Sequence, residues 1–146
     1  MRLGARFLGA ALLTLTGVAG APAFAQDTAL ADTLRQVAMD NTAAYDREDL
    51  AAAVATIATK SPDYESTQKE LPAQFADLEV KSELVSFQYI GHDDEFAVAR
   101  AKVKTVGTPK TADFADNTVD MILVFHQDGG VWKLWTDEIL GVELHP

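Results

Sequence analysis

Three side chains in the C-terminal third of the chain could move a proton. Histidine is a common general base near neutral pH, and His126 follows an unbroken apolar run over residues 121–125. Asp120 and Asp137 lie in adjacent predicted strands, where an inward-facing carboxylate would have a raised pKa. The alternatives are a solvent-facing histidine beside a turn and two carboxylates on a solvated face. The spacing of six puts His126 and Asp120 on one face, but too far apart to touch.

Two tryptophans in the same region could bind an apolar ligand. Trp132 and Trp135 could stack on a steroid-like, polyketide or lipid fragment. Alternatively they are core or interface residues, because a domain of this size without disulfides needs the apolar area that they bury. Both interpretations can hold, one for each tryptophan.

The sequence predicts no metal and no other cofactor. The turn from His92 to Glu95 places four possible ligands together, but consecutive residues in a turn cannot all converge on an ion, and no calcium-loop spacing follows. The chain has no cysteine, which excludes thiol catalysis and thiolate metal sites. We expect a solvated turn here.

Three helices should precede these strands. Apolar residues recur at three- and four-residue spacing from Leu30 to Tyr45, which predicts an amphipathic helix. Asp49 is a suitable N-cap for a second helix, which Pro62 would end. Residues 65–75 predict a short third helix or helical turn.

Four strands complete the predicted order. Residues 80–89 and 95–106 predict one hairpin, and residues 114–127 and 131–140 predict a second one around a glycine-rich turn. Helices followed by strands indicate an α+β domain, with helices on one face of an antiparallel sheet.

The strand pairing can be estimated from the turns. We expect Phe87 opposite Val98 in the first hairpin, and Leu123 opposite Trp135, or one residue away, in the second. Either register leaves both faces of the second hairpin apolar. Other parts of the protein, or a second subunit, must therefore pack against each face of this hairpin.

The N-terminus predicts export. Two nearby arginines, an apolar run over residues 7–18 and a small-x-small sequence ending at Ala25 are typical of a secretory signal peptide. The run is shorter than the roughly 20 residues of a transmembrane helix, so a retained anchor is the weaker alternative. Cleavage between Ala25 and Gln26 would remove residues 1–25 and leave residues 26–146 as one domain. We expect this domain in a bacterial periplasm or outside the cell.

The charge of the mature chain limits its partners. Removing 25 of 146 residues leaves 121, and the loss of two arginines changes the net charge from −10 to −12. Such a surface repels phosphate backbones, so we expect neither nucleic acid nor, after cleavage, an anionic membrane as partner.

Two stretches carry a resemblance to a known family. The helix junction AAYDREDLAAAVATI and the terminal hairpin FHQDGGVWKLWTDEIL, in this order of elements, resemble the NTF2-like superfamily, which includes the SnoaL-like proteins. Both stretches are folding signals and neither is a catalytic motif. The resemblance implies a cone, in which about three helices pack on a strongly curved antiparallel sheet of four or more strands. It also implies a pocket at the open end and a homodimer through the outer sheet face.

The resemblance supplies candidate residues by type. The superfamily includes isomerases, dehydratases and cyclases, whose sites use Asp, His or Tyr inside the cone. The candidates of these types are Tyr45, Tyr64, Asp113, Asp120, His126 and Asp137, and none maps onto a family catalytic motif. The candidates for ligand contact are Tyr45, Tyr64, Trp132 and Trp135. For Tyr45 the alternative is a core residue at the helix junction.

Three functions remain open at this stage. We favour an exported, non-catalytic domain that binds a small apolar ligand or partner in its pocket and dimerises through its sheet. The second hypothesis is an isomerase, dehydratase or cyclase with an aspartate or histidine base. The third is an oligomeric association module, for which the cone would be filled.

Overall fold

The computed structural model describes residues 23–145, with side chains from Asp27 onward. The predicted signal peptide lies outside the described residues, except for its last three positions, which begin the first helix. None of the described helices has the length and apolar character that are needed to cross a membrane.

The three predicted helices are confirmed, but the predicted end of the second at Pro62 is wrong, because it ends at Ala55 with Thr56 as its C-cap. They are α1 (Ala23–Asp46), α2 (Leu50–Ala55) and α3 (Tyr64–Asp77). The side chain of Asp49 caps α2, because its carboxylate accepts a hydrogen bond of 3.0 Å from the backbone N–H of Ala52. The cap satisfies one of the free N–H groups at the start of this short helix.

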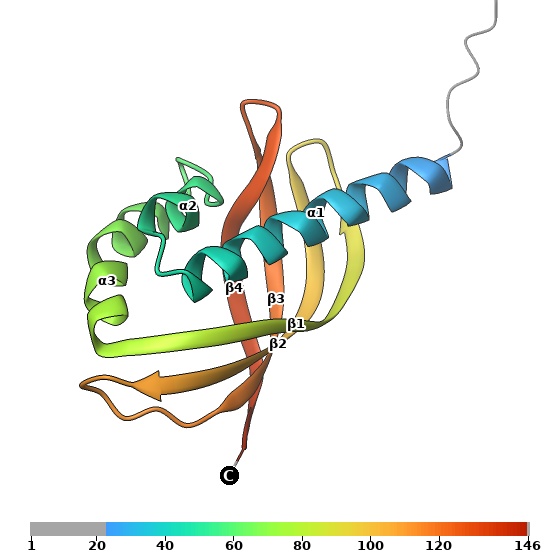
Figure 1. Cartoon of the computed structure of the whole chain (residues 1–146). Coiled ribbons are helices and arrows are strands. Elements are labelled where there is room, and N and C mark those ends of the chain that lie inside the picture. The colour runs from blue at the N-terminus through green and yellow to red at the C-terminus, as the bar shows by residue number, and fades with distance from the viewer. Residues whose placement is uncertain (1–22, 146) are drawn as a thin grey trace, which may run out of the picture.

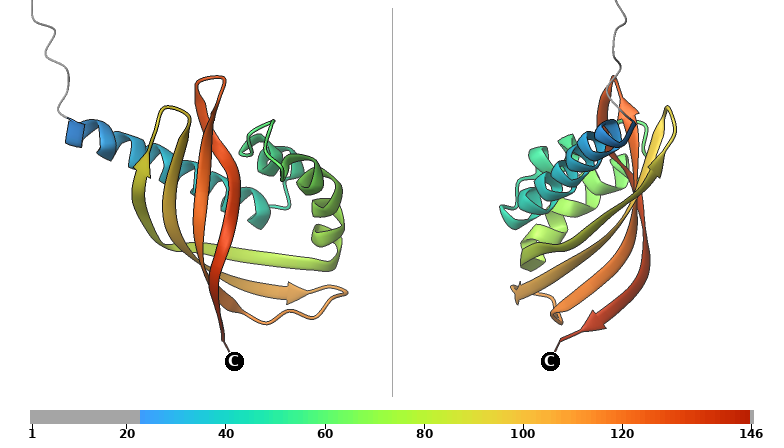
Figure 2. Two further views of the ribbon diagram at one scale, coloured as in Figure 1. Left: turned by 180° about the vertical axis from the view of Figure 1, so that it is seen from behind. Right: turned by 90° about the vertical axis from the view of Figure 1, so that its right-hand side faces the viewer.

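The four predicted strands are also confirmed. They are β1 (Leu78–His92), β2 (Phe96–Pro109), β3 (Asn117–Asp128) and β4 (Val131–Leu144), and they form one antiparallel sheet in the order β1-β2-β3-β4. α1 runs across the sheet, with α2 and α3 beside its C-terminal end (Figure 1). All three helices lie on one side of the curved sheet (Figure 2). We call this side the inner face and the opposite side the outer face.

The main core lies between α1 and the inner face of the sheet. Leu34 of α1 and Phe125 of β3 are fully buried there. β2 contributes three fully buried alanines to the same core, Ala97, Ala99 and Ala101. Their small side chains let α1 approach the sheet closely, while the alternate residues of β2 point to the outer face.

The predicted register of the first hairpin is wrong. Phe87 pairs with Ala101 instead of Val98. Two irregularities shift the pairing, since Val85 and Ile90 have no partner in the β1–β2 ladder. Each is a bulge residue, and both side chains are more than half exposed. The turn alone could not indicate these extra residues.

The predicted register of the second hairpin is also wrong. Leu123 pairs with Asp137, because Trp135 is left out of the ladder between β3 and β4. Without this bulge, counting back from the turn would pair Asp137 with Ile122 on the outer face. The extra residue therefore turns Asp137 to the inner face.

Candidate functional site

A cavity of about 440 Å³ lies between the three helices and the inner face of the sheet. Its floor is apolar and includes Leu84 of β1, Met121 and Leu123 of β3, and Leu134 of β4. The α3 side is polar, with Asp63, Ser66, Thr67, Glu70 and Gln74. An apolar floor with a few polar groups at its border is typical of sites for small molecules.

The polar border follows from the sequence of α3. The five polar positions are separated by three or four residues, or stand next to each other, so they share one face of the helix. This polar stripe was not among the predicted site residues, although its spacing is readable in the sequence. What the sequence does not show is that this face looks into a cavity instead of into solvent.

The cavity carries negative charge. Among the described residues that line it are three carboxylates, Asp63, Glu70 and Asp137, and no Lys, Arg or His. An anionic ligand would meet repulsion here, because no cation compensates these charges.

Asp137 stands at the mouth of the cavity on β4. Its side chain remains partly open to solvent, but loss of hydration raises the pKa of its carboxyl group, and the charges of Asp63 and Glu138 raise it further. A carboxylate with a raised pKa accepts a proton more readily than an ordinary aspartate does. The position therefore offers either a base or a hydrogen-bond partner for a ligand.

Tyr45 lines the same cavity from α1. Burial raises the pKa of its hydroxyl group, and the nearby charge of Asp137 adds to this effect. The ring packs edge-on against Phe75, with 6.0 Å between the ring centroids. Tyr45 thus keeps its proton at neutral pH and can donate a hydrogen bond inside the cavity.

Backbone contacts hold the rim around the bulge of β4. The segment after α2 forms a parallel bridge to β4, in which the N–H of Leu134 donates to the carbonyl of Thr56 and the N–H of Ala58 donates to the carbonyl of Leu134, both at 2.8 Å. Buried Ser61 donates from Oγ to the carbonyl of Trp135 at 2.5 Å. The same Oγ accepts a hydrogen bond of 2.9 Å from the N–H of Asp63, next to the start of α3. These bonds fix the distance between β4 and the polar border.

Of the predicted ligand-contact residues Trp132, Trp135 and Tyr64, only Trp135 borders the cavity. Trp135 borders the cavity, yet its ring packs against Phe96 and His126, with ring centroid distances of 5.6 and 4.9 Å. Trp132 packs against the main core. Neither Trp132 nor half-buried Tyr64 is among the described residues that line the cavity.

His126 and Asp120 both lie on the outer face, as their pairing partners on β2 show. Asp120 accepts two hydrogen bonds from Arg100, of 2.8 Å from Nε and 2.6 Å from a terminal nitrogen, and this pairing lowers the pKa of its carboxyl group. The ring of His126 lies 4.7 Å from that of Phe96, and its Nδ1 is buried without a hydrogen-bond partner among the described residues. Asp113 is exposed in the loop before β3.

The turn between β1 and β2 is exposed from His92 to Glu95. The carboxylate of Asp93 accepts hydrogen bonds from the N–H groups of Glu95 and Phe96, at 2.8 and 2.7 Å, and these bonds lower its pKa. Within residues 23–145, no group of three or more His, Asp or Glu side chains is arranged to hold a metal ion.

The three helices and the curved antiparallel sheet have the NTF2-like fold that the resemblance in the sequence implied. Solved structures with this fold include a hexachlorocyclohexane dehydrochlorinase, which is 10% identical with a TM-score of 0.62 and matches 84% of this chain and 93% of its own. A ketosteroid isomerase-like protein from Erwinia carotovora atroseptica is 13% identical with a TM-score of 0.57, over 76% of this chain and 96% of its own. An NTF-2 like protein of unknown function from Shewanella oneidensis MR-1 is 14% identical with a TM-score of 0.52, over 74% of this chain and 96% of its own. At these identities the likeness shows the fold alone.

A family model also matches the sequence of this chain. Residues 36–144 match the family described as the C-terminal domain of the anti-sigma-I factor RsgI9. This chain belongs to that family. No curated protein matches its sequence.

Proposed function

We propose that this domain binds a small, largely apolar molecule in the cavity between its helices and the inner face of the sheet. The observation that carries the proposal is the cavity itself, with its apolar floor, its polar border on α3 and its three uncompensated carboxylates. The ligand is uncharged or positively charged, since an anion would be repelled. Its polar group faces Tyr45 and Asp137, and its apolar part lies over Leu123.

Filling the cavity tests this proposal. Thr67 lines the cavity from α3, whereas its exposed neighbour Gln68 does not. We expect 2-naphthol, a neutral probe, to bind the unmodified domain in a calorimetric titration. Thr67→Trp should weaken binding at least tenfold because the indole occupies the site, and Gln68→Trp should leave binding unchanged. Equal affinity in all three proteins would place the probe elsewhere, and no binding to any of them would contradict the proposal.

One observation favours a second candidate function, which is proton-transfer catalysis. Asp137, with its raised pKa, borders the cavity into which Tyr45 can donate a hydrogen bond. The names of two structural relatives, a dehydrochlorinase and a ketosteroid isomerase-like protein, suggest substrates to try. If the domain is such an enzyme, Asp137→Asn should lower turnover at least 100-fold. Glu138→Gln, on the neighbouring position of the outer face, should not. Absence of turnover in the unmodified protein would remove this candidate.

We also propose that the domain forms a homodimer through the outer face of its sheet. Ile122 and Val124 lie there only half-buried, beside the ring cluster of Phe96, His126 and Trp135. A second copy would cover these apolar side chains. Light scattering after size exclusion should give twice the monomer mass, and Val124→Lys should give the monomer. A monomeric unmodified protein at high concentration would contradict this proposal.

The place of action is a further part of the proposal. We infer export through the predicted signal peptide and cleavage between Ala25 and Gln26. The intact mass of the protein from a periplasmic or culture fraction should then correspond to residues 26–146. Uncleaved protein confined to the cytoplasm would contradict export.

A further inference from the structure

A groove of about 380 Å³ adjoins the cavity, between α1 and β1. Thr42, Ser82 and Leu84 line both the cavity and the groove, so the two spaces meet at these three residues. The groove lies where the bulge residue Val85 leaves the β1–β2 ladder. Half-buried Leu84 packs against the main core and separates the two spaces.

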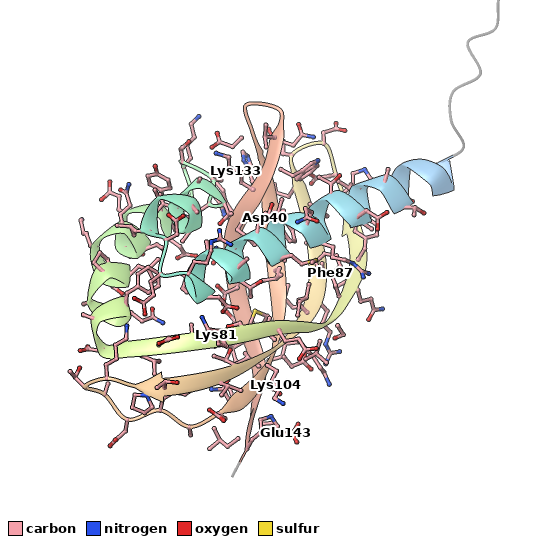
Figure 3. All side chains as sticks on the ribbon, viewed as in Figure 1. Asp40, Lys81, Phe87, Lys104, Lys133 and Glu143 are labelled. Carbon is pink, nitrogen blue, oxygen red and sulfur yellow. The ribbon has the colours of Figure 1, made fainter. Side chains whose placement is uncertain are left out.

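The groove is lined by both polar and apolar side chains, and two of the apolar ones are exposed. Met39 of α1 is 45% exposed and Val85 of β1 is 53% exposed, although both face this hollow. Phe87 closes one end, where the guanidinium carbon of Arg35 lies 5.6 Å from the centre of its ring (Phe87 is labelled in Figure 3). Arg35 is the only basic residue among the described residues that line the two spaces.

The other end of the groove is held by a hydrogen bond. The N–H of Ser82 donates to Oδ1 of Asp46 at 2.8 Å, which ties the C-terminal end of α1 to the edge strand β1. The position of the groove relative to the cavity is thus fixed by the fold. An unbranched chain that left the cavity past Leu84 would exchange water for contact with Met39 and Val85.

We propose that the ligand of the cavity is elongated, with a polar head group beside Tyr45 and Asp137 and an unbranched aliphatic chain that passes Leu84 and lies in the groove between Met39 and Val85. This inference rests on the proposed function, because the head group occupies the cavity. The chemical class is an aliphatic amphiphile whose head group carries no negative charge.

The test is a chain-length series of 1-alkanols, from four to twelve carbons, titrated calorimetrically into residues 26–146. Each buried methylene should tighten the dissociation constant about fourfold, and the increments should continue after the chain has filled the cavity. Val85→Glu replaces an apolar side chain of the groove with a charged one and does not change the cavity lining. It should abolish the increments of the longer alkanols and leave the affinities of the shorter ones unchanged. Gln88→Glu, an exposed position of β1 outside both spaces, is the matched control and should behave as the unmodified domain.

Two results would overturn the inference, and they differ in meaning. If the affinity stops rising with chain length and Val85→Glu has no effect at any length, the groove is not used, while binding of the short alkanols still supports the proposed function. If no alkanol of any length binds, the proposed function fails as well.

Discussion

The two ends of α1 cover the sheet in different ways. Toward its N-terminal half, Leu34 meets Phe125 and the alanines of β2 with no exposed surface. Toward its C-terminal end, Asn41 and Tyr45 face a cavity of about 440 Å³. We call these regions the packed half and the hollow half. The packed half supplies the apolar burial that stabilises a domain without disulfides, which leaves the hollow half free to contain a site.

Truncation of a large side chain should reveal the largest difference in unfolding free energy between the packed half and the hollow half. Phe125→Ala in the packed half should cost about 3–5 kcal/mol of unfolding free energy, because it removes buried apolar surface and leaves a void. Leu84→Ala in the hollow half should cost about 1 kcal/mol, since that side chain is only half-buried and already borders a space. Urea denaturation of both variants measures the difference. Equal losses would mean that the two regions are packed alike.

Loss of one hydroxyl group should test whether the hollow half has a rigid rim. Ser61→Ala removes the hydrogen bond to the carbonyl of Trp135 and the acceptor for the N–H of Asp63, at a position that is 7% exposed. Buried groups left without partners cost about 1–3 kcal/mol, so urea denaturation should show a loss in this range. Ser66→Ala, at an exposed position of the polar border, is the control and should be nearly neutral. A neutral Ser61→Ala would show that the rim is held by other contacts.

The smallest expected effect concerns the charge of Asp137. Its folded-state pKa is raised above the ordinary value of 3.8, so the folded protein binds more protons than the unfolded chain between these two pKa values. Its contribution to stability is therefore complete below pH 3.8 and is lost as the pH rises through the raised pKa. Asp137→Asn cannot ionise and should have a slightly higher Tm than the unmodified protein at pH 7, with no advantage near pH 3. Asp113→Asn, at an exposed loop position, should show neither change. A lower Tm at pH 7 would mean that the carboxylate is favourably paired in the folded state.

The order of the elements was predictable because it depends on local patterns. The apolar spacing from Leu30 to Tyr45, the cap at Asp49 and the glycine turn before β4 each act within a few residues. The pairing of the strands was not predictable, because bulges at Val85 and Trp135 have no local signal and each changes the register of the residues beyond it.

The same bulges explain why the sequence does not show which candidate residues face the cavity. Asp120 and Asp137 look equivalent in the sequence, yet the extra residue at Trp135 turns only Asp137 to the inner face, while Arg100 binds Asp120 on the outer face. The cavity is a space that the side chains of packed elements leave unfilled. The types of the residues in the sequence do not predict where such a space remains. The polar stripe on α3 was readable, but its direction requires the packing of that helix on its neighbours.

The most direct measurement of the central claim is a crystal structure of residues 26–146 with 6-bromo-2-naphthol, located by the anomalous signal of its bromine. We expect one strong peak inside the hollow half, with the hydroxyl group of the probe toward Tyr45 and Asp137 and its rings over Leu123. A peak on the outer face of the sheet, or a cavity closed by its own side chains with no bromine inside, would contradict the assignment of the hollow half as a binding site.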